Sequence, residues 1–332
     1  MEDRGHILTD DALLKLEQRI KDTYGDAAAE VQKTIDEYFD SFKKRDAEQK
    51  KLLEQEKITE EQYKQWRLAQ IGRGKRFEAL RDMLAERMTK ANEISISYVN
   101  DTTPGIYSLN HNYAAYTIEQ IGGDVGFTLL DEQTVKRLVA EQPDLMPYYP
   151  RDKAVARGID IKWGKQQITA QVTSGILQGE SIKDISQRLQ KNIPTMHQVS
   201  AIRAARTAVT EAENAGRQAS YDRAKELGVP VKKRWMAVHD MRTRDAHAKA
   251  DGQTVDLDAP FKVDGYKMMY PGDPSAPAYL VYNCRCTTRT VEREGIEAEP
   301  RMMRVRNPVT GRNELVSEMT YAEWLEWKGA AK

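Results

Sequence analysis

Apolar residues recur at steps of three and four through the first ninety residues, which predicts long amphipathic helices. The clearest stripe consists of Ile20, Tyr24, Ala28, Val31, Ile35, Phe39 and Phe42. A second helix is expected to begin at Thr59, because Thr59 and Gln62 have the spacing of a capping box. A third is expected to run through Phe77, Leu80, Leu84 and Met88. Such helices must pack on each other or on a partner, since isolated helices are marginal in water.

The pattern weakens after the third helix and is interrupted by turn-forming residues. We expect a break at Thr103-Pro104-Gly105 and a turn at Gly122-Gly123-Asp124. A short helix is predicted over 132–140, with Asp131 as its cap. Three prolines make 143–160 an irregular stretch, and we place a domain boundary there.

The chain then returns to a helical period. Helices are predicted over 163–177, over 181–189 and over 196–227, with Gly179 ending the first and Pro194 preceding the third. Gly228 and Pro230 are expected to end the long helix.

The pattern beyond residue 230 changes to the period of two that is typical of strands. Val231–Val238 alternates and is predicted to be a strand near an edge of a sheet. Glycines and prolines make 239–278 rich in loops, one or two further strands are expected within 279–291, and 321–327 predicts a short terminal helix.

These patterns together predict a predominantly helical α+β protein. Long N-terminal helices precede a C-terminal module of helices with a small antiparallel sheet. We divide the chain into a helical region at 1–150, a module at 151–292 and a tail with a short helix at 293–332. No apolar run approaches the roughly 18 residues of a membrane span, and the first residues lack the apolar core of a signal peptide.

Charge changes this picture in one respect. Lys and Arg number 51, as do Asp and Glu, so no uniform field for binding nucleic acid is present. Residues 1–40 nevertheless carry five basic and eleven acidic side chains, whereas residues 41–90 carry fourteen basic and nine acidic. This change of sign suits docking against a partner of mixed charge, and a solvated helix surface is the alternative.

One face of the long helix is polar. It consists of Arg203, Arg206, Thr210, Asn214, Arg217 and Tyr221. The arginines either bind a carboxylate or phosphate, as guanidinium groups do, or pair inside the fold with Glu211, Glu213 or loop aspartates.

The densest polar segment runs from His239 to His247 and is followed by Asp251. Histidines and aspartates together suit metal binding or acid–base chemistry. The favoured interpretation is structural: Asp240 and Asp251 form turns, and His247 is a hydrogen-bonding residue of the fold.

A C-x-C pair follows at Cys284 and Cys286, and on a strand both sulfur atoms would share one face. With His247, and with Asp240 or His239, they would complete a zinc site. The pair supplies only half of a tetrahedral shell, so buried free thiols are the commoner outcome. We therefore expect no cofactor, with zinc on the histidine and the cysteines as the alternative.

Taken in order, these pieces resemble the phage Mu F-like head morphogenesis family. The matching pieces are Ile202–Thr207, Glu211, Asn214, Trp235, Asp240–His247, Asp251–Gln253, Pro271–Pro274 and Asn283–Cys286. They cover roughly 160–292, and Tyr321–Trp324 is also similar to family endings. The family commonly has Glu directly after its arginine–threonine pair, whereas Ala208 stands here.

The resemblance implies a minor capsid protein rather than an enzyme. Such proteins enter the procapsid in few copies, associate with the portal vertex, and assist head assembly, DNA packaging or DNA delivery. The expected partners are the portal protein, major capsid or scaffolding proteins and packaged DNA, and the expected location is the virion interior, with the host cytoplasm during assembly. The helical region at 1–150 is expected to dock on the portal or capsid.

The expected structural polar cluster consists of Arg203, Arg206, Glu211, Asn214, Trp235, Asp240, Arg242, Arg244, His247 and Asp251. DNA contacts are expected at Lys232, Lys233 and Arg234. Two other functions stay open. One is a metal-dependent hydrolase or nuclease that uses His247, Asp240, Asp251 and the cysteines, and the other is a DNA-binding protein without catalysis.

Overall fold

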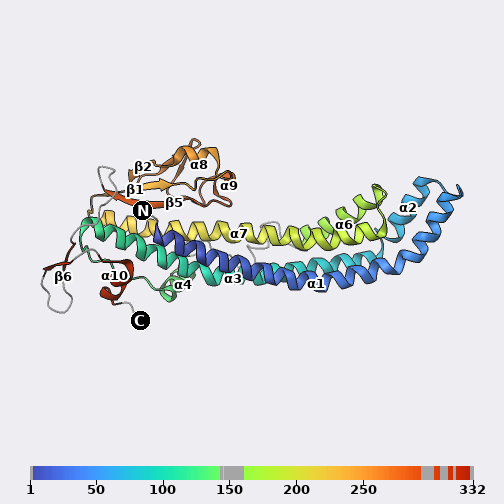
Figure 1. Cartoon of the computed structure of the whole chain (residues 1–332), viewed down its shortest axis with the longest axis horizontal. Coiled ribbons are helices and arrows are strands. Elements are labelled where there is room, and N and C mark those ends of the chain that lie inside the picture. The colour runs from blue at the N-terminus through green and yellow to red at the C-terminus, as the bar shows by residue number, and fades with distance from the viewer. Residues whose placement is uncertain are drawn as a thin grey trace. The chain divides into compact units, whose positions relative to one another are not determined.

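The computed structural model describes residues 3–142, 145, 161–292, 303–306, 313–316 and 319–329. The predicted α+β class, mainly helical with small antiparallel sheets, is confirmed (Figure 1). The chain forms two compact units. Unit 1 consists of Met1–Leu16, Val99–Tyr148 and Arg203–Lys332, and unit 2 consists of Glu17–Tyr98 and Tyr149–Ile202.

The elements follow in chain order. The helices are α1 (Arg4–Glu54), α2 (Glu60–Gln70), α3 (Lys75–Gly122), α4 (Glu132–Glu141), α6 (Ile161–Leu177), α7 (Ile182–Glu226), α8 (Asp245–Ala250), α9 (Ala278–Val281) and α10 (Tyr321–Trp327). The strands are β1 (Val231–Met236), β2 (Thr254–Asp256), β3 (Phe261–Val263), β4 (Tyr266–Met268), β5 (Thr287–Glu292), β6 (Met303–Arg306) and β7 (Asn313–Val316).

Unit 2 is held by the apolar stripe that the helical period predicts. Its buried members on α1 are Ile20, Tyr24, Ala27, Val31, Ile35, Phe39 and Phe42, so Ala27 is buried where Ala28 was expected. The predicted stripe of α3 is buried as well. Polar side chains tie the helices together at the rim: Arg87 pairs with Glu30, and Ser186 donates a hydrogen bond to Asp36.

Local signals fix the ends of the shorter helices. The Thr59 hydroxyl accepts a hydrogen bond from the backbone N–H of Gln62, and the Gln62 side chain accepts one from that of Thr59, which completes the predicted capping box. Asp131 caps α4. At the end of α6, Gly179 has a φ of +76° and the backbone N–H of Glu180 reaches back to the carbonyl of Gly175, as expected for a helix-ending glycine.

The predicted breaks at two prolines are wrong. Pro104 lies inside α3 and Pro194 lies inside α7, so the two helices expected over 181–189 and 196–227 are one. A proline inside a helix removes one hydrogen bond and costs about 3 kcal/mol. Burial on both sides of each proline outweighs that cost, because neighbours such as Ile106, Tyr107 and Ile193 are almost completely buried.

The main sheet of unit 1 has the strand order β2-β1-β5, and all its pairs are antiparallel. The predicted alternation of β1 is confirmed, since Val231, Lys233 and Trp235 are buried. Its predicted place near an edge is wrong: β1 is the central strand, because the three-residue β2 covers its other side.

The loop-rich segment 239–278 also contains short elements. A β3–β4 hairpin turns through Asp264 and Gly265, which both have positive φ, as a two-residue hairpin turn requires. Within 279–291 the structure has β5 as the predicted strand, but the first residues belong to the short helix α9.

The predicted terminal helix is α10, and it packs in unit 1 around a buried carboxylate. Glu119 accepts hydrogen bonds from the indole N–H of Trp324 (2.7 Å), the ammonium of Lys328 (2.9 Å) and the backbone N–H of Phe127 (3.1 Å). Burial raises the pKa of Glu119, and the Lys328 ammonium opposes that shift. A buried carboxylate is tolerated here because each oxygen has donors.

The structure does not test the predicted irregular stretch or the predicted domain division. The irregular stretch around Pro143, Pro147 and Pro150 lies outside the described residues, and the division at 150 and 292 stays a prediction. Among the helices that the structure describes, none combines the length and the apolar character needed to cross a bilayer.

Candidate functional site

Part of the polar face of α7 is buried against the chain segment that carries the cysteines. Thr210 donates a hydrogen bond to the carbonyl oxygen of Cys284 (2.6 Å). Asn214 donates to that of Cys286 (3.1 Å) and Arg217 to that of Thr288 (2.5 Å).

The spacing explains this match. A step of three or four helical residues advances about 4.5–6 Å, and two residues of extended chain advance about 6.6 Å. The spacing of the donors along α7 is therefore close enough to the spacing of the carbonyl groups along 284–288 for three successive hydrogen bonds. Thr210, Asn214 and Arg217 of the predicted polar face therefore form a hydrogen-bonding ladder between α7 and 284–288.

Within this ladder, Arg217 is almost completely buried, at 1% exposed, and it also bonds to groups outside 284–288. Its guanidinium group donates two 2.7 Å hydrogen bonds to the carboxylate of Asp3, and its Nε donates to Asn110 (3.0 Å). The Glu213 carboxylate lies 3.5 Å away. For Arg217, pairing inside the fold is therefore the correct interpretation.

The first turn of α1 adds a second, partly buried ion pair. His6 Nδ1 lies 2.8 Å from Glu213 Oε1, and the hydroxyl of Thr287 donates to the same oxygen (2.7 Å). The Glu213 carboxylate raises the pKa of His6 to about 9. Sequence reasoning missed Asp3 and His6, because no local pattern links them to residues some 200 positions away.

His6→Gln is expected to show how this pair depends on pH. The folded pKa of His6, about 9, lies above the usual value of 6.5, so its stabilisation is complete below about pH 6.5 and is lost as the pH rises through 9. Urea unfolding should give the wild type an advantage over His6→Gln of about 1–2 kcal/mol near pH 6. The advantage should nearly vanish near pH 10, and an advantage that grows with pH would contradict the assignment.

The aspartate-rich segment forms turns and ion pairs. Asp240 accepts two hydrogen bonds from Arg285 (2.6 and 2.8 Å) and one from the backbone N–H of Arg242 (2.9 Å), which is the geometry of an Asx turn. The hydrogen bonds from Arg285 hold the pKa of Asp240 well below its usual range. Asp251 accepts from the backbone N–H of Ala237 and lies 3.0 Å from His239.

The remaining members of the predicted cluster are spread over unit 1. Arg203 is exposed on α7, Arg206 is half-buried and Glu211 is buried. Arg242 is exposed, and Arg244 donates to the carbonyl oxygen of Tyr282. Arg203 and Arg242 therefore take no part in a buried polar cluster.

Three of the predicted metal-ligating residues lie close together. His247 on α8, Cys284 and Cys286 are buried, and one ligand atom from each lies within 4.8 Å of the others. His247 Nδ1 is 3.3 Å from the sulfur of Cys286 and 3.5 Å from that of Cys284. Trp235 packs edge-on against the imidazole ring, with centroids 5.7 Å apart.

The sequence predicts that His247, Cys284 and Cys286 come together, but the strand on which that prediction rests is wrong. Cys284 and Cys286 precede β5, which begins at Thr287, so they do not lie on a strand. His239 and Asp240, the other expected ligands, are engaged with Asp251 and Arg285 instead.

Comparison with known proteins gives this region a family. The family model described as Phage Mu protein F like protein matches residues 166–289, a range that includes α7, the aspartate turn and both cysteines. This region of the chain is similar to the Mu F-like family.

Two curated relatives are similar to the chain. The minor head protein GP7 of Bacillus phage SPP1 is 27% identical over 273 residues, which cover 79% of this chain and 82% of GP7. The NAD(+)–arginine ADP-ribosyltransferase EFV of Enterococcus faecalis (strain ATCC 700802 / V583) is 34% identical over 136 residues, or 41% of this chain. The chain spans only 27% of that transferase's length. No solved structure matches.

The predicted DNA contacts of the Mu F-like region need one correction. Lys233 is completely buried, and its ammonium donates to Gln218 and to the carbonyl oxygen of Met269, both at 2.8 Å. Burial lowers its pKa to about 8. Lys233 therefore cannot face DNA. Lys232 and Arg234 are half-buried on the other face of β1, where Lys232 lies 3.4 Å from Asp256 and Arg234 donates to Thr254.

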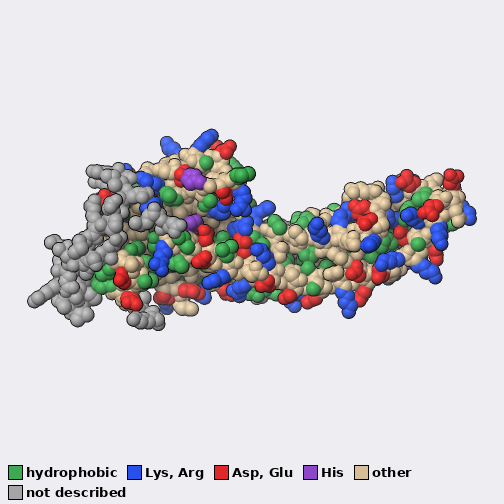
Figure 2. Space-filling view, in the orientation of Figure 1, with side chains coloured by type: hydrophobic (Ala, Val, Ile, Leu, Met, Phe, Trp, Pro, Cys, Tyr) green, Lys and Arg blue, Asp and Glu red, His purple; other side chains and the backbone are tan. Residues whose placement is uncertain are grey.

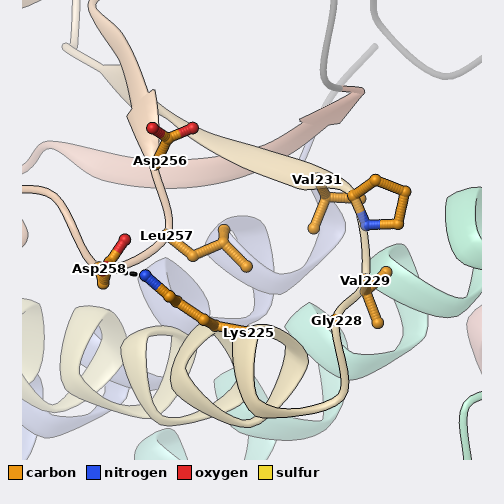
Figure 3. Close-up of a pocket in the computed structure, with 8 residues that line it drawn as sticks. Lys225, Gly228, Val229, Val231, Asp256, Leu257 and Asp258 are labelled. Atoms are coloured by element: carbon orange, nitrogen blue, oxygen red, sulfur yellow. Dashed lines mark hydrogen bonds and ion pairs between the residues drawn. The ribbon is translucent and has the colours of Figure 1, made fainter.

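A hollow of about 290 Å³ lies at the end of α7 (Figure 3). It is lined by Lys225, Gly228, Val229, Pro230, Val231, Asp256, Leu257 and Asp258. Lys225 and Asp258 form an ion pair beside it. None of the candidate residues of the Mu F-like region lines it, so it is separate from the histidine–cysteine group.

Proposed function

We propose that this protein is a minor head protein of a tailed phage and acts in head morphogenesis. The similarity to GP7 carries this proposal. It covers 273 residues, about twice the Mu F-like range, and therefore draws on both units. A shared Mu F-like region alone would leave most of unit 2 unexplained.

The geometry supports a structural role over a metal-dependent hydrolase. Such an enzyme needs carboxylates that converge on a divalent ion with an open coordination position. Asp240 is instead held by Arg285, and Asp251 by Ala237 and His239. Thr210, Asn214 and Arg217 of α7 are likewise hydrogen-bonded to the backbone of 284–288.

The transferase relative does not change this proposal. Its match reaches 136 residues and about a quarter of that protein, so the activity in its name belongs to a much longer chain. A fold can be shared without the activity of the whole protein. The protein is accordingly proposed to be non-enzymatic.

The portal protein is the proposed partner, and unit 2 is the proposed docking surface. Basic and acidic side chains are interspersed along the face shown in Figure 2, which suits a partner of mixed charge. Lys50, Lys51 and Lys57 are exposed near the end of α1 and in the loop that follows. Rim charges of this kind govern the association rate and the salt dependence of binding.

Charge reversal tests this docking better than truncation. Deleting residues 1–92 would also remove Asp3 and His6, whose partners lie in unit 1. The triple variant Lys50→Glu, Lys51→Glu, Lys57→Glu leaves those contacts intact. The matched control is Lys249→Glu, Lys262→Glu, Lys267→Glu, which makes the same charge change at three exposed lysines of unit 1.

Co-purification with tagged portal protein of the same phage is the measurement. The wild type and the unit 1 control are expected to be retained, and the unit 2 variant is expected to lose about tenfold in affinity, or about 1.4 kcal/mol. Failure of the wild type to bind portal would overturn the partner. Equal binding by the wild type and the unit 2 variant would overturn the docking surface.

A further inference from the structure

The histidine–cysteine group has the donor set of a zinc site. Thiolate sulfur and imidazole nitrogen are the ligands that zinc prefers over magnesium or calcium. His247 and Cys286 are 2% and 3% exposed, and Cys284 is 2% exposed. Among the described residues, no carboxylate lies close enough to join them. The donor set therefore excludes a hard cation.

The distances also suit zinc. Zinc–sulfur bonds of about 2.3 Å and zinc–nitrogen bonds of about 2.0–2.1 Å, at tetrahedral angles, put nitrogen and sulfur about 3.6 Å apart. The two distances from His247 Nδ1 are 3.3 and 3.5 Å. Small side-chain movements would bring all three atoms into bonding distance.

Charge balance favours the same ion. Two thiolates and a neutral imidazole around Zn²⁺ form a group with no net charge, which can be buried without the large cost of an isolated charge. Binding releases two thiol protons to solvent, and no oxidation or reduction is involved. The backbone N–H of Cys286 points at the sulfur of Cys284 (3.4 Å), a contact that supports a thiolate.

We propose that His247, Cys284 and Cys286 bind one zinc ion and supply three of its ligands. The ion joins α8 to the segment that Thr210 and Asn214 already hold on α7. It thereby closes the loop between His247 and Cys284 and fastens the β3–β4 hairpin region to the long helix. Its role is structural, because the three ligands are shielded from solvent.

Metal analysis of the full-length protein, purified without a metal-affinity tag, tests this proposal. The wild type is expected to contain about one equivalent of zinc. His247→Asn, Cys284→Ser and Cys286→Ser are each expected to fall below about a tenth of an equivalent. The matched control is His239→Ala, which removes an exposed histidine of the same segment and should keep its zinc.

Cobalt substitution keeps the test decisive if the variants do not fold. Co²⁺ added to the zinc-free wild type should give the intense visible bands of a tetrahedral site and a thiolate charge-transfer band. Zinc below about a tenth of an equivalent, together with no such spectrum, would overturn the proposal. A mass decrease of two hydrogens in the peptide that contains both cysteines would also overturn it, because the pair would then be a disulfide.

Discussion

Replacing Arg217 with alanine is expected to lower the free energy of unfolding by about 3–5 kcal/mol. The guanidinium group is buried and bonded to Asp3, Asn110 and the backbone of Thr288. Removing it leaves the carboxylate of Asp3 without its two hydrogen bonds from the guanidinium group, and it removes the second cation beside Glu213, which keeps only His6. An uncompensated buried charge costs far more than a lost surface pair.

Urea unfolding followed by far-ultraviolet circular dichroism measures this loss. Arg223→Ala is the matched control, since Arg223 also lies on α7 but pairs with Glu226 at the exposed surface. Its effect should stay within about 0.5 kcal/mol. If both variants unfold at the same urea concentration, Arg217 does not hold unit 1 together as described.

Replacing Gly216 with alanine is expected to lower the free energy of unfolding by about 2–3 kcal/mol. A Cβ atom at Gly216 would overlap the carbonyl oxygen of Tyr107 and lie 3.2 Å from the backbone nitrogen of His111. These are backbone atoms of α3, so α3 and α7 would have to move apart. Because the clashing atoms belong to the backbone, no side-chain rotation can relieve the contact.

Gly25→Ala is the control with the opposite sign. Gly25 lies inside α1, and a Cβ atom there meets nothing within 4 Å. Alanine is the better helix former, so this variant should gain about 0.5–1 kcal/mol. Thermal unfolding of the two variants beside the wild type measures both effects. Equal melting temperatures for both variants would contradict the close helix approach.

The sequence predicted those features that leave a local signature. The apolar stripe of unit 2 has a helical period, and capping residues such as Thr59 and Asp131 act on N–H groups three residues away. The alternation of β1 and the bounds of α10 were also predictable, because each depends on a few consecutive residues.

Features that depend on distant partners were not predictable. Pro104 and Pro194 break helices by local rules, but tertiary burial overrides those rules here. The central position of β1 depends on pairing with a three-residue strand that has too short a pattern to recognise. The ion pair of Arg217 with Asp3 joins residues 214 positions apart.

The histidine–cysteine group is an intermediate case. The residue types pointed to a common site, and the structure brings His247, Cys284 and Cys286 together. The geometry was nevertheless expected from a strand that begins only at Thr287. Chemistry was therefore a better guide here than local conformation.

Quantitative mass spectrometry of purified procapsids and mature heads tests the proposed function most directly. A role in head morphogenesis predicts this chain in those particles, in few copies relative to the major capsid protein. Its absence from both particles, in lysates where the free protein is abundant, would contradict the assignment as a minor head protein.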